Sequence, residues 1–115
     1  MKQQEHIEQK HFKQWFEVRY PKKLMFAVPN GGMRNIKVAM KLKAEGVKAG
    51  VPDICIPEPS GNYHGLFIEM KKEKGKNPEP AQQEWLDALN ARGYKAVCCK
   101  GFEQACNAAK EYLEA

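Results

Sequence analysis

Two short apolar segments of this chain each carry ionisable residues that could do chemistry. Asp53 lies in the run Val51-Pro52-Asp53-Ile54-Cys55-Ile56, and Glu69 and Lys71 lie in Gly65-Leu66-Phe67-Ile68-Glu69-Met70-Lys71. Short, mostly apolar runs of this kind are typical of buried or half-buried strands. A buried charge is costly unless it is paired or bound to a metal ion. These three residues therefore need a reason for their positions, and a divalent-metal site supplies one.

The spacing of these residues predicts where they meet. Because side chains alternate along a strand, Glu69 and Lys71 share one face, while Met70 points to the other face and into the core. If the two strands pair, Asp53 and Glu69 converge at one edge of the sheet. Two converging carboxylates repel each other unless a cation lies between them, and Mg²⁺ or Mn²⁺ prefers such oxygen ligands. Lys71 would stand close enough to contact a phosphate or an attacking water, which is the arrangement that phosphodiester hydrolysis needs.

The short motif by itself also has an ordinary structural interpretation, and on the motif alone that interpretation is favoured. Asp53 could cap a turn, and Glu69 with Lys71 could form a surface pair on an edge strand. His64 could act as a base, although a hydrogen-bonding loop histidine is the more common case.

A helix over about 3–19 is the first element expected to position the site. Phe12, Trp15 and Phe16 form an apolar stripe at helical spacing, and Glu5 and Glu8 fall on the same stripe. Either glutamate could complete the ligand set of a metal, or the first turn could extend beyond the core and leave both in water. The helical wheel does not separate these two acids.

The remaining elements follow from hydrophobic periodicity and turn signals. Residues 57–63 form a loop with two prolines, which predicts that the two acidic strands are adjacent and antiparallel. Beyond the acidic strands, we expect strands over 24–28 and 94–100, a helix starting near Ile36 and closed near Gly46, a helix after Pro80 capped by Gly93, and a last helix over 102–113. The predicted fold is a single α/β domain over residues 1–115, a mixed sheet flanked by helices in the order α-β-α-β-β-α-β-α.

Composition narrows the class of protein. The chain has 115 residues and a net charge of +5, which is compatible with a polyanionic partner. No stretch is long and apolar enough for a membrane span and no signal peptide is recognisable, so we expect a cytoplasmic protein without a membrane partner. The cysteines lack zinc-site spacing and are predicted to be reduced, mostly buried thiols: Cys55, Cys98, Cys99 and Cys106.

A wider pattern resembles a known family. The core Pro52-Asp53 … Glu69-Met70-Lys71 looks like that of the PD-(D/E)xK nucleases. The following segments together resemble the virus-type replication-repair nuclease (VRR-NUC) domain, and most closely its small stand-alone phage members: Pro29-Asn30-Gly31-Gly32-x-Arg34, 42–53, 63–71 and Gln82-x-x-Trp85. The likeness runs from about Glu5 to Leu113 and implies a restriction-endonuclease-like core.

The resemblance implies a metal-dependent DNA endonuclease and assigns its residues. Catalytic positions are implied at Asp53, Glu69, Lys71, Gln82 and Glu5, with Gln83 as the neighbouring rival of Gln82 and Glu8 as the alternative to Glu5. Ligands of Mg²⁺ or Mn²⁺ are expected at Asp53, Glu69, Met70 and Glu5. For DNA binding we predict Asn30, Gly31, Gly32, Arg34, Lys48, Lys72, Lys74 and Lys76.

One position departs from the family's pattern. Glu79 stands where family members often carry a serine cap before the helix of Gln82, which predicts a frayed helix start and a loosened Gln82.

The stand-alone relatives resemble Holliday-junction resolvases that act as homodimers, so a structure-selective endonuclease acting on branched DNA is the leading interpretation. A non-catalytic module that binds branched DNA on a nuclease fold is the alternative from another class. A small phage regulator that binds protein partners is the third.

Overall fold

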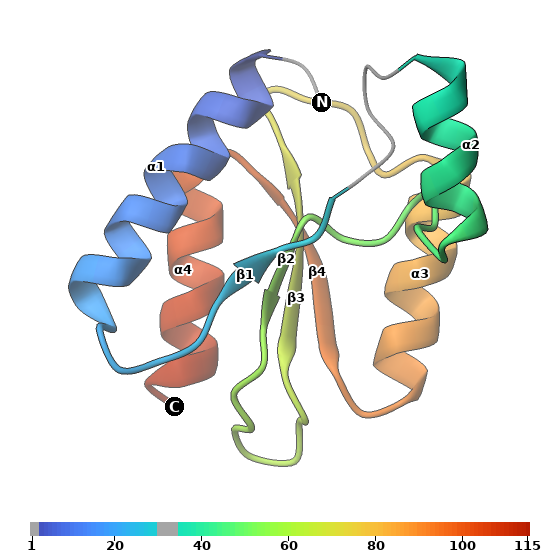
Figure 1. Cartoon of the computed structure of the whole chain (residues 1–115). Helices are drawn as coiled ribbons and strands as arrows, with labels where there is room; N and C mark the ends of the chain where they lie inside the picture. The colour runs from blue at the N-terminus through green and yellow to red at the C-terminus, as the bar shows by residue number, and fades with distance from the viewer. Residues whose placement is uncertain (1–2, 30–34) are drawn as a thin grey trace.

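A four-stranded mixed sheet forms the centre of the protein (Figure 1). The computed structural model describes residues 3–29 and 35–115. The strands lie in the order β1 (Phe26–Ala27), β2 (Ile54–Ile56), β3 (Leu66–Lys71) and β4 (Lys95–Lys100). β2 pairs antiparallel with both β1 and β3, whereas β4 runs parallel to β3. The predicted α/β class, the order of elements and the antiparallel pairing of the two acidic strands are confirmed.

The described residues form four helices, and three of these pack against the two faces of the sheet. The four helices are α1 (Gln3–Arg19), α2 (Ile36–Ala44), α3 (Pro80–Ala91) and α4 (Phe102–Leu113). α1 and α4 lie side by side against one face, and α3 packs against β4 on the other (Figure 1). The sheet is therefore the middle layer of three.

Strand alternation divides the apolar side chains between these two faces. Ile54, Ile68 and Met70 belong to the larger core cluster, which includes Phe12 and Phe16 from α1. Phe67 belongs with the smaller cluster, whose buried members include Leu86 and Leu89 of α3. Because Glu69 and Lys71 alternate with Ile68 and Met70, they point to the face covered by α3. The fold thus directs the ionisable residues of β3 away from the main core.

Several elements are shorter than the sequence predicts. The strand expected over 24–28 contains only Phe26 and Ala27, and the strand expected over 51–56 begins at Ile54. Pro52 has no N–H to add to a sheet ladder, which limits the strand on that side. The carbonyl of Asp53 still accepts the N–H of Val28 at 2.8 Å, so Asp53 remains fixed against the sheet although it precedes β2.

Glycine closes two helices at the predicted positions. α2 ends at Ala44, and Gly46 follows with φ of 105°, in the left-handed region. The N–H of Val47 then returns to the carbonyl of Leu42 at 2.9 Å, which is a Schellman closure. Val47 therefore lies outside the helix, which closes near Gly46 as expected. Gly93 closes α3 in the same way, with φ of 91°.

The cysteines behave as predicted. All four are free, and Cys55, Cys99 and Cys106 are buried. Burial raises the pKa of the Cys99 thiol to about 12 and that of Cys106 to about 11. Both groups are therefore protonated and unreactive at neutral pH.

No helix within the described part of the chain is long and apolar enough to cross a membrane.

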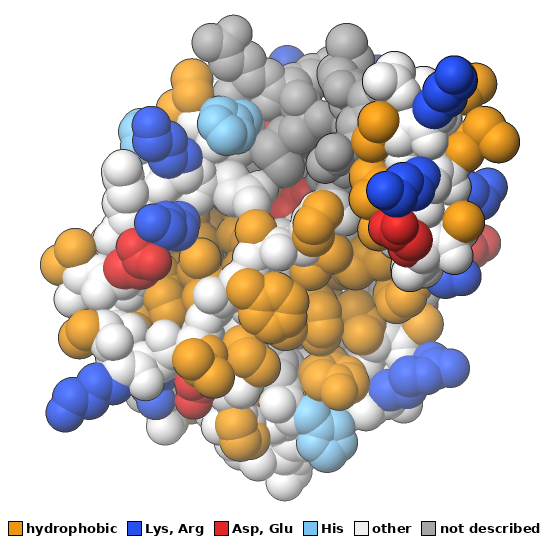
Figure 2. Space-filling model, viewed as in Figure 1, with side chains coloured by type: hydrophobic (Ala, Val, Ile, Leu, Met, Phe, Trp, Pro, Cys, Tyr) orange, Lys and Arg blue, Asp and Glu red, His pale blue; other side chains and the backbone are white. Residues whose placement is uncertain are grey.

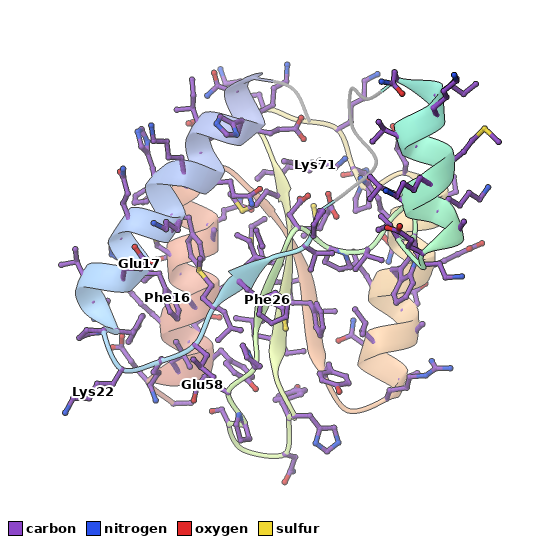
Figure 3. The ribbon with its side chains drawn as sticks, viewed as in Figure 1. Phe16, Glu17, Lys22, Phe26, Glu58 and Lys71 are labelled. Atoms are coloured by element: carbon purple, nitrogen blue, oxygen red, sulfur yellow. The ribbon has the colours of Figure 1, made fainter. Side chains whose placement is uncertain are left out.

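Hydrophobic side chains gather on the face where β1 closes the sheet (Figure 2). Phe26 of β1 lies in the middle of this view and is 52% exposed (Figure 3). On α2, Ile36 is 75% and Met40 66% exposed, and the helix buries none of its residues. β1 and α2 thus offer apolar surface that the rest of the described chain leaves in solvent.

Candidate active site

The pairing of β2 with β3 brings Asp53 and Glu69 together. The register sets Ile54 opposite Ile68, so one further step along the two strands sets Asp53 opposite Glu69. Both carboxyl groups are almost fully buried, with exposed fractions of 2% and 3%. Oδ2 of Asp53 accepts the N–H of Met70 at 2.8 Å. The backbone of β3 therefore holds Asp53 in place beside the acid that the same strand carries.

The surroundings of Glu69 strongly perturb its carboxyl group. The pKa of Glu69 is raised to about 9, first because the group is buried and then because of the negative charge of Asp53 and a hydrogen bond with it. The positive charge of Lys71 acts in the opposite direction, and Glu5 adds a further upward shift. Near neutral pH the pair therefore carries a proton between its oxygens unless a cation takes that place.

Gln82 links the side chains of Lys71 and Glu69. Lys71 Nζ donates to Gln82 Oε1 at 2.9 Å, and Gln82 Nε2 donates to Glu69 Oε2 at 3.2 Å. The neighbouring Gln83 is exposed and instead donates to Asp87 at 2.9 Å. Of the two glutamines that the sequence left as rivals, Gln82 is the one that reaches Glu69 and Lys71.

The expected loosening of Gln82 by a weak cap is wrong. Oε1 of Gln82 also accepts the N–H of Glu79 at 2.8 Å, so the glutamine itself closes the first turn of α3. Pro80 occupies the first position of the helix, where a missing N–H leaves no hydrogen bond unmade. Glu79 therefore serves as the N-cap residue of a helix whose start is fixed from inside the site.

An open pocket of about 570 Å³ lies over these residues. Asp53, Glu69, Lys71 and Gln82 line it, and the segment 72–79 contributes basic and polar groups: Lys72, Lys74, Gly75, Lys76, Asn77 and Glu79. Lys71 lies at the carboxyl end of β3 (Figure 3). The predicted Lys48 is exposed but does not line the pocket. Asn30, Gly31, Gly32 and Arg34 lie outside the described residues.

The structure separates the two glutamates of the first helix. Glu5 lines the pocket, and its negative charge is one of the causes that raise the pKa of Glu69. Glu8 is 8% exposed and does not line the pocket, and its carboxylate accepts two backbone N–H groups elsewhere. The helix therefore presents Glu5 to the site and commits Glu8 to another contact.

Met70 can face the site only through its backbone. Its side chain is 1% exposed and belongs to the core cluster on the opposite face of the sheet. In an extended residue the N–H and C=O point to the same side of the strand. Because the N–H of Met70 points to Asp53, its carbonyl faces the side on which Asp53 lies.

The site offers few acidic side chains to a divalent ion. No group of three or more His, Cys, Asp or Glu side chains within residues 3–29 and 35–115 is spaced to hold a metal. Mg²⁺, however, commonly uses one or two carboxylates and completes its shell with waters and substrate phosphates. A buried pair of carboxyl groups that must otherwise share a proton fits that requirement.

Sequence reasoning missed two neighbours of the site. Cys98 lies opposite Glu69 in the parallel register of β3 and β4, and Asn77 lines the pocket while accepting a hydrogen bond from Lys100 at 3.0 Å. The register of a parallel pair is not visible in the local sequence, so no signal pointed to Cys98. His64, considered as a base, precedes β3, and its N–H donates to the carbonyl of Gly93 at 2.9 Å. The structure does not bring His64 to the pocket.

The comparisons with known proteins place the chain in a family. The family described as the VRR-NUC domain matches residues 1–103. A solved structure described as a VRR_NUC domain protein is similar over 99% of this chain and 91% of its own, with 30% identity and a TM-score of 0.82. A second, described as a VRR_NUC domain, shares the fold with 23% identity and a TM-score of 0.64, over 95% of this chain and 97% of its own. No curated protein compared with the chain matches it. With its PD-(D/E)xK-like sheet and a family match over most of its length, the chain belongs to the VRR-NUC family of nuclease domains.

Proposed function

We propose that this protein is a Mg²⁺- or Mn²⁺-dependent DNA endonuclease that hydrolyses phosphodiester bonds. The observation that carries the proposal is the buried pair of Asp53 and Glu69 beside Lys71 in an open pocket. Membership of a family of nuclease domains supports a nuclease and a DNA substrate. The metal dependence and the choice of DNA substrate go beyond what membership of this family supports.

The ion would be held by Asp53 and Glu69, with the backbone carbonyl of Met70 on the same side of β3 and Glu5 on the pocket wall. These are hard oxygen donors, which Mg²⁺ and Mn²⁺ prefer. When bound, the ion would polarise the scissile phosphate and make water more acidic.

The protein's own groups would orient the reactants. Gln82 holds the Lys71 ammonium and a Glu69 oxygen at once, so Lys71 is fixed at the carboxyl end of β3. From there the ammonium would contact a phosphate oxygen or orient the attacking water. The water oxygen would bond to phosphorus while the bond to the 3′ oxygen breaks, and the 3′ oxygen would take up a proton. The products would be a 3′ hydroxyl and a 5′ phosphate.

Lysines beside the pocket would bind the DNA backbone. Lys72, Lys74 and Lys76 line the pocket, and Lys48 is exposed. Contacts to phosphates release counterions, so DNA binding should weaken steeply as salt rises. Asn30, Gly31, Gly32 and Arg34, which lie outside the described residues, complete the proposed binding set.

We further propose that the active form is a homodimer that cuts branched DNA, with four-way junctions preferred. Two sites related by a two-fold axis could nick two opposing strands of a junction. The exposed apolar side chains of β1 and α2 supply surface that a second copy could cover, Phe26 and Met40 among them.

A substrate panel tests the proposal. Purified protein is incubated with labelled four-way junction, flap, splayed-arm and linear duplex DNA in Mg²⁺, Mn²⁺ or EDTA, and its mass in solution is measured. We expect cleavage in either metal, none in EDTA, a preference for the junction, and the mass of a dimer. Asp53→Ala, Glu69→Ala and Lys71→Ala should each abolish cleavage and largely spare DNA binding, whereas the exposed controls Asp87→Ala and Lys22→Ala should cut like the wild type.

Salt-dependent DNA binding without cleavage in either metal would overturn the catalytic proposal and favour a non-catalytic binding module. Mg²⁺-dependent cleavage by Asp53→Ala protein would overturn the assignment of the site.

A further inference from the structure

Glu8 is a buried acid that the proposed chemistry does not use. Its Oε2 accepts the N–H of Glu73 at 3.0 Å, and its Oε1 accepts the N–H of Phe102 at 2.9 Å. The side chain comes from α1, whereas both donors belong to segments more than sixty residues further along the chain. One carboxylate therefore fastens α1 to two distant stretches of backbone.

Both of these stretches begin where the central strands end. Glu73 belongs to the segment that leaves β3 after Lys71, and Phe102 is the first residue of α4, directly after β4. Gly101, between β4 and α4, donates its N–H to the carbonyl of Lys71 at 2.8 Å. A carboxylate is also favoured at the positive N-terminal end of a helix such as α4. Glu8 thus lies at the junction of α1, β3 and α4.

The backbone at this junction leaves little freedom. Gly101 has φ of 93°, and a Cβ added there would lie 3.2 Å from Oε1 of Glu8 and 3.3 Å from Glu73. The turn is therefore built closely around the carboxylate. Further along the segment 72–79, Asn77 Oδ1 accepts a hydrogen bond from Lys100 Nζ at 3.0 Å. The segment 72–79 is tied down at both ends, by Glu8 near its start and by Lys100 near its end.

Residues close in sequence to Glu8 and to its partner Glu73 line the pocket. Glu5 precedes Glu8 by three residues, which is nearly one helical turn, so fixing Glu8 also fixes Glu5. Glu73 stands between Lys72 and Lys74, both of which line the pocket. The segment that joins β3 to α3 passes over this end of the molecule (Figure 1).

We propose that Glu8 is a positioning residue: its two hydrogen bonds hold Glu5 and the lysines of 72–76 in fixed positions relative to one another within the pocket. The inference rests on the proposed nuclease function, since it assigns a role within that site. Loss of Glu8 should therefore disturb metal and DNA binding more than the chemical step at saturation. A purely structural contact would lower stability alone.

Glu8→Gln tests this role, because it replaces one of the two accepting oxygens with an NH₂ group that cannot accept a hydrogen bond. The control is Glu17→Gln, on the same helix, which removes an exposed ion pair with Lys13. We expect Glu8→Gln to raise KM for DNA about tenfold and the half-saturating Mg²⁺ concentration several-fold, with kcat at saturation within about twofold of the wild type. Glu17→Gln should match the wild type. Glu8→Asp keeps both oxygens on a shorter side chain, so its KM and its Mg²⁺ requirement should lie between those of the wild type and Glu8→Gln. It serves as the test variant if Glu8→Gln does not fold.

Three outcomes would overturn the positioning role. One is an active Glu8→Gln enzyme with wild-type KM and Mg²⁺ requirement, and another is a change in melting temperature with both constants unchanged. The third is unchanged hydrogen exchange at the Glu73 and Phe102 amides. A wild-type protein that cuts no DNA would instead overturn the proposed function. In that case the dissociation constant of Glu8→Gln for DNA decides the positioning role, since an unchanged constant overturns it.

Discussion

Two carboxyl groups of this protein are held together in a buried position, and the pKa of one of them, Glu69, is raised well above its ordinary value. Asp53 is fixed by the N–H of Met70, and Glu69 is fixed by the amide of Gln82. A sheet that needed only stability would not place two acids opposite each other in its interior. The arrangement costs stability in the absence of a cation, as expected for a site organised around a ligand.

That cost gives a prediction for the metal-free protein. The folded-state pKa of Glu69, about 9, lies above its ordinary value of 4.5, so between these values the folded chain binds a proton that the unfolded chain has lost. The contribution of this group to stability is therefore present at low pH and is lost as pH rises through that window. In EDTA the melting temperature of the wild type should fall from about pH 5 to about pH 9 more than that of Glu69→Gln, by several degrees.

Mg²⁺ supplies the counterpart of this experiment. At about pH 8 the ion should raise the melting temperature of the wild type and leave that of Glu69→Gln nearly unchanged, because ligand binding to the folded state stabilises it. Parallel pH curves for the two proteins in EDTA would contradict the account of the acid pair.

The sequence predicts the residues of this site better than their contacts. Alternation and spacing predict that Asp53 and Glu69 converge and that Lys71 shares a face with Glu69, because the pleat of a strand decides which face a residue takes. Their assignment to a site came from the resemblance to a nuclease family, since the short motif alone favours an ordinary structural interpretation. Glu5 and Glu8 could not be separated, since both fall on one helical face and only the packing partner tells them apart. Gln82 was expected to be loose because Glu79 is a poor cap, and the sequence does not show that the glutamine caps its own helix.

At the scale of elements, the outer edge of β4 is closed by side chains. Asn90 of α3 pairs with the N–H and the carbonyl of Ala96, both at 3.0 Å. Gln104 of α4 accepts the N–H of Lys100 at 2.8 Å. Two amides thus occupy backbone groups that would otherwise be free to pair with another chain. This edge is therefore protected against strand-to-strand association.

Asn90→Ala should expose that edge. The variant leaves the N–H and carbonyl of Ala96 without their partner, which should lower the free energy of unfolding by about 1–3 kcal/mol. Urea denaturation measures the loss, and light scattering should detect increased association. Asn107→Ala, an exposed asparagine on α4, is the matched control and should change neither. Equal stability of the two variants would show that the Asn90 contact contributes nothing.

The sequence predicts the ends of helices well, because local capping residues set them. It predicts the ends of strands poorly, because pairing with distant residues sets them. Gly46 and Gly93 mark the ends of α2 and α3 because a left-handed backbone position favours glycine. β1 and β2 are shorter than their apolar runs, since strand length depends on how many neighbouring residues find partners. The parallel pairing of β3 with β4, and with it the position of Cys98, depends on contacts across more than twenty residues of chain.

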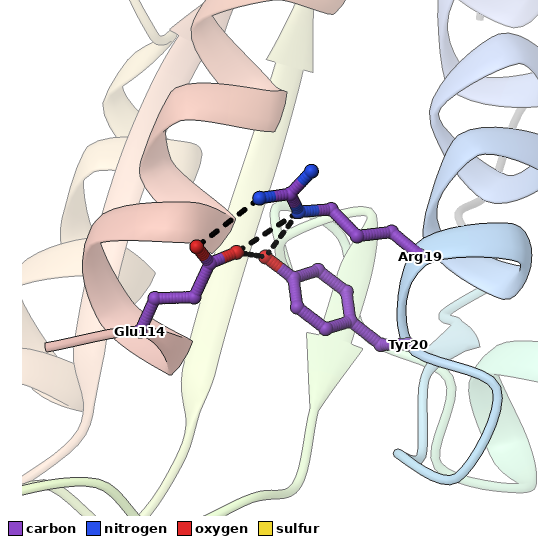
Figure 4. Close-up of polar contacts among 3 residues, drawn as sticks. All are labelled: Arg19, Tyr20 and Glu114. Carbon is purple, nitrogen blue, oxygen red and sulfur yellow. Dashed lines mark hydrogen bonds and ion pairs between the residues drawn. The ribbon is translucent and has the colours of Figure 1, made fainter.

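At the scale of the whole molecule, the end of α1 is tied to the end of the chain. Arg19 donates to both carboxylate oxygens of Glu114, at 2.9 and 3.1 Å, and the Tyr20 hydroxyl donates to the same carboxylate (Figure 4). The Arg19 hydrogen bond, followed by that of Tyr20, lowers the pKa of Glu114 to about 2. Burial and the Glu114 hydrogen bond raise the pKa of Tyr20. The cluster closes α1 against α4, the two helices that cover the main core.

This cluster predicts a stability change with a defined pH dependence. Because the folded pKa of Glu114 is depressed, its contribution is present above the ordinary value of 4.5 and is lost as pH falls towards 2. Glu114→Gln should therefore lower the melting temperature by about 1–3 °C near neutral pH, since the group is exposed and screened, and the difference should vanish near pH 2. Glu111→Gln on the same helix should show no such trend. A difference that persists unchanged at low pH would rule out the ionic contact as its cause.

If Asp53 and Glu69 form a metal-dependent cutting site, removing one carboxylate must slow cleavage itself. The decisive quantity is the single-turnover rate of DNA cleavage in Mg²⁺ by Asp53→Asn protein, measured against the wild type at saturating enzyme. We expect this rate to fall by at least about a thousandfold, the equivalent of roughly 4 kcal/mol of lost transition-state stabilisation. Cleavage by the variant at the wild-type rate would show that the acid pair is not the cutting site.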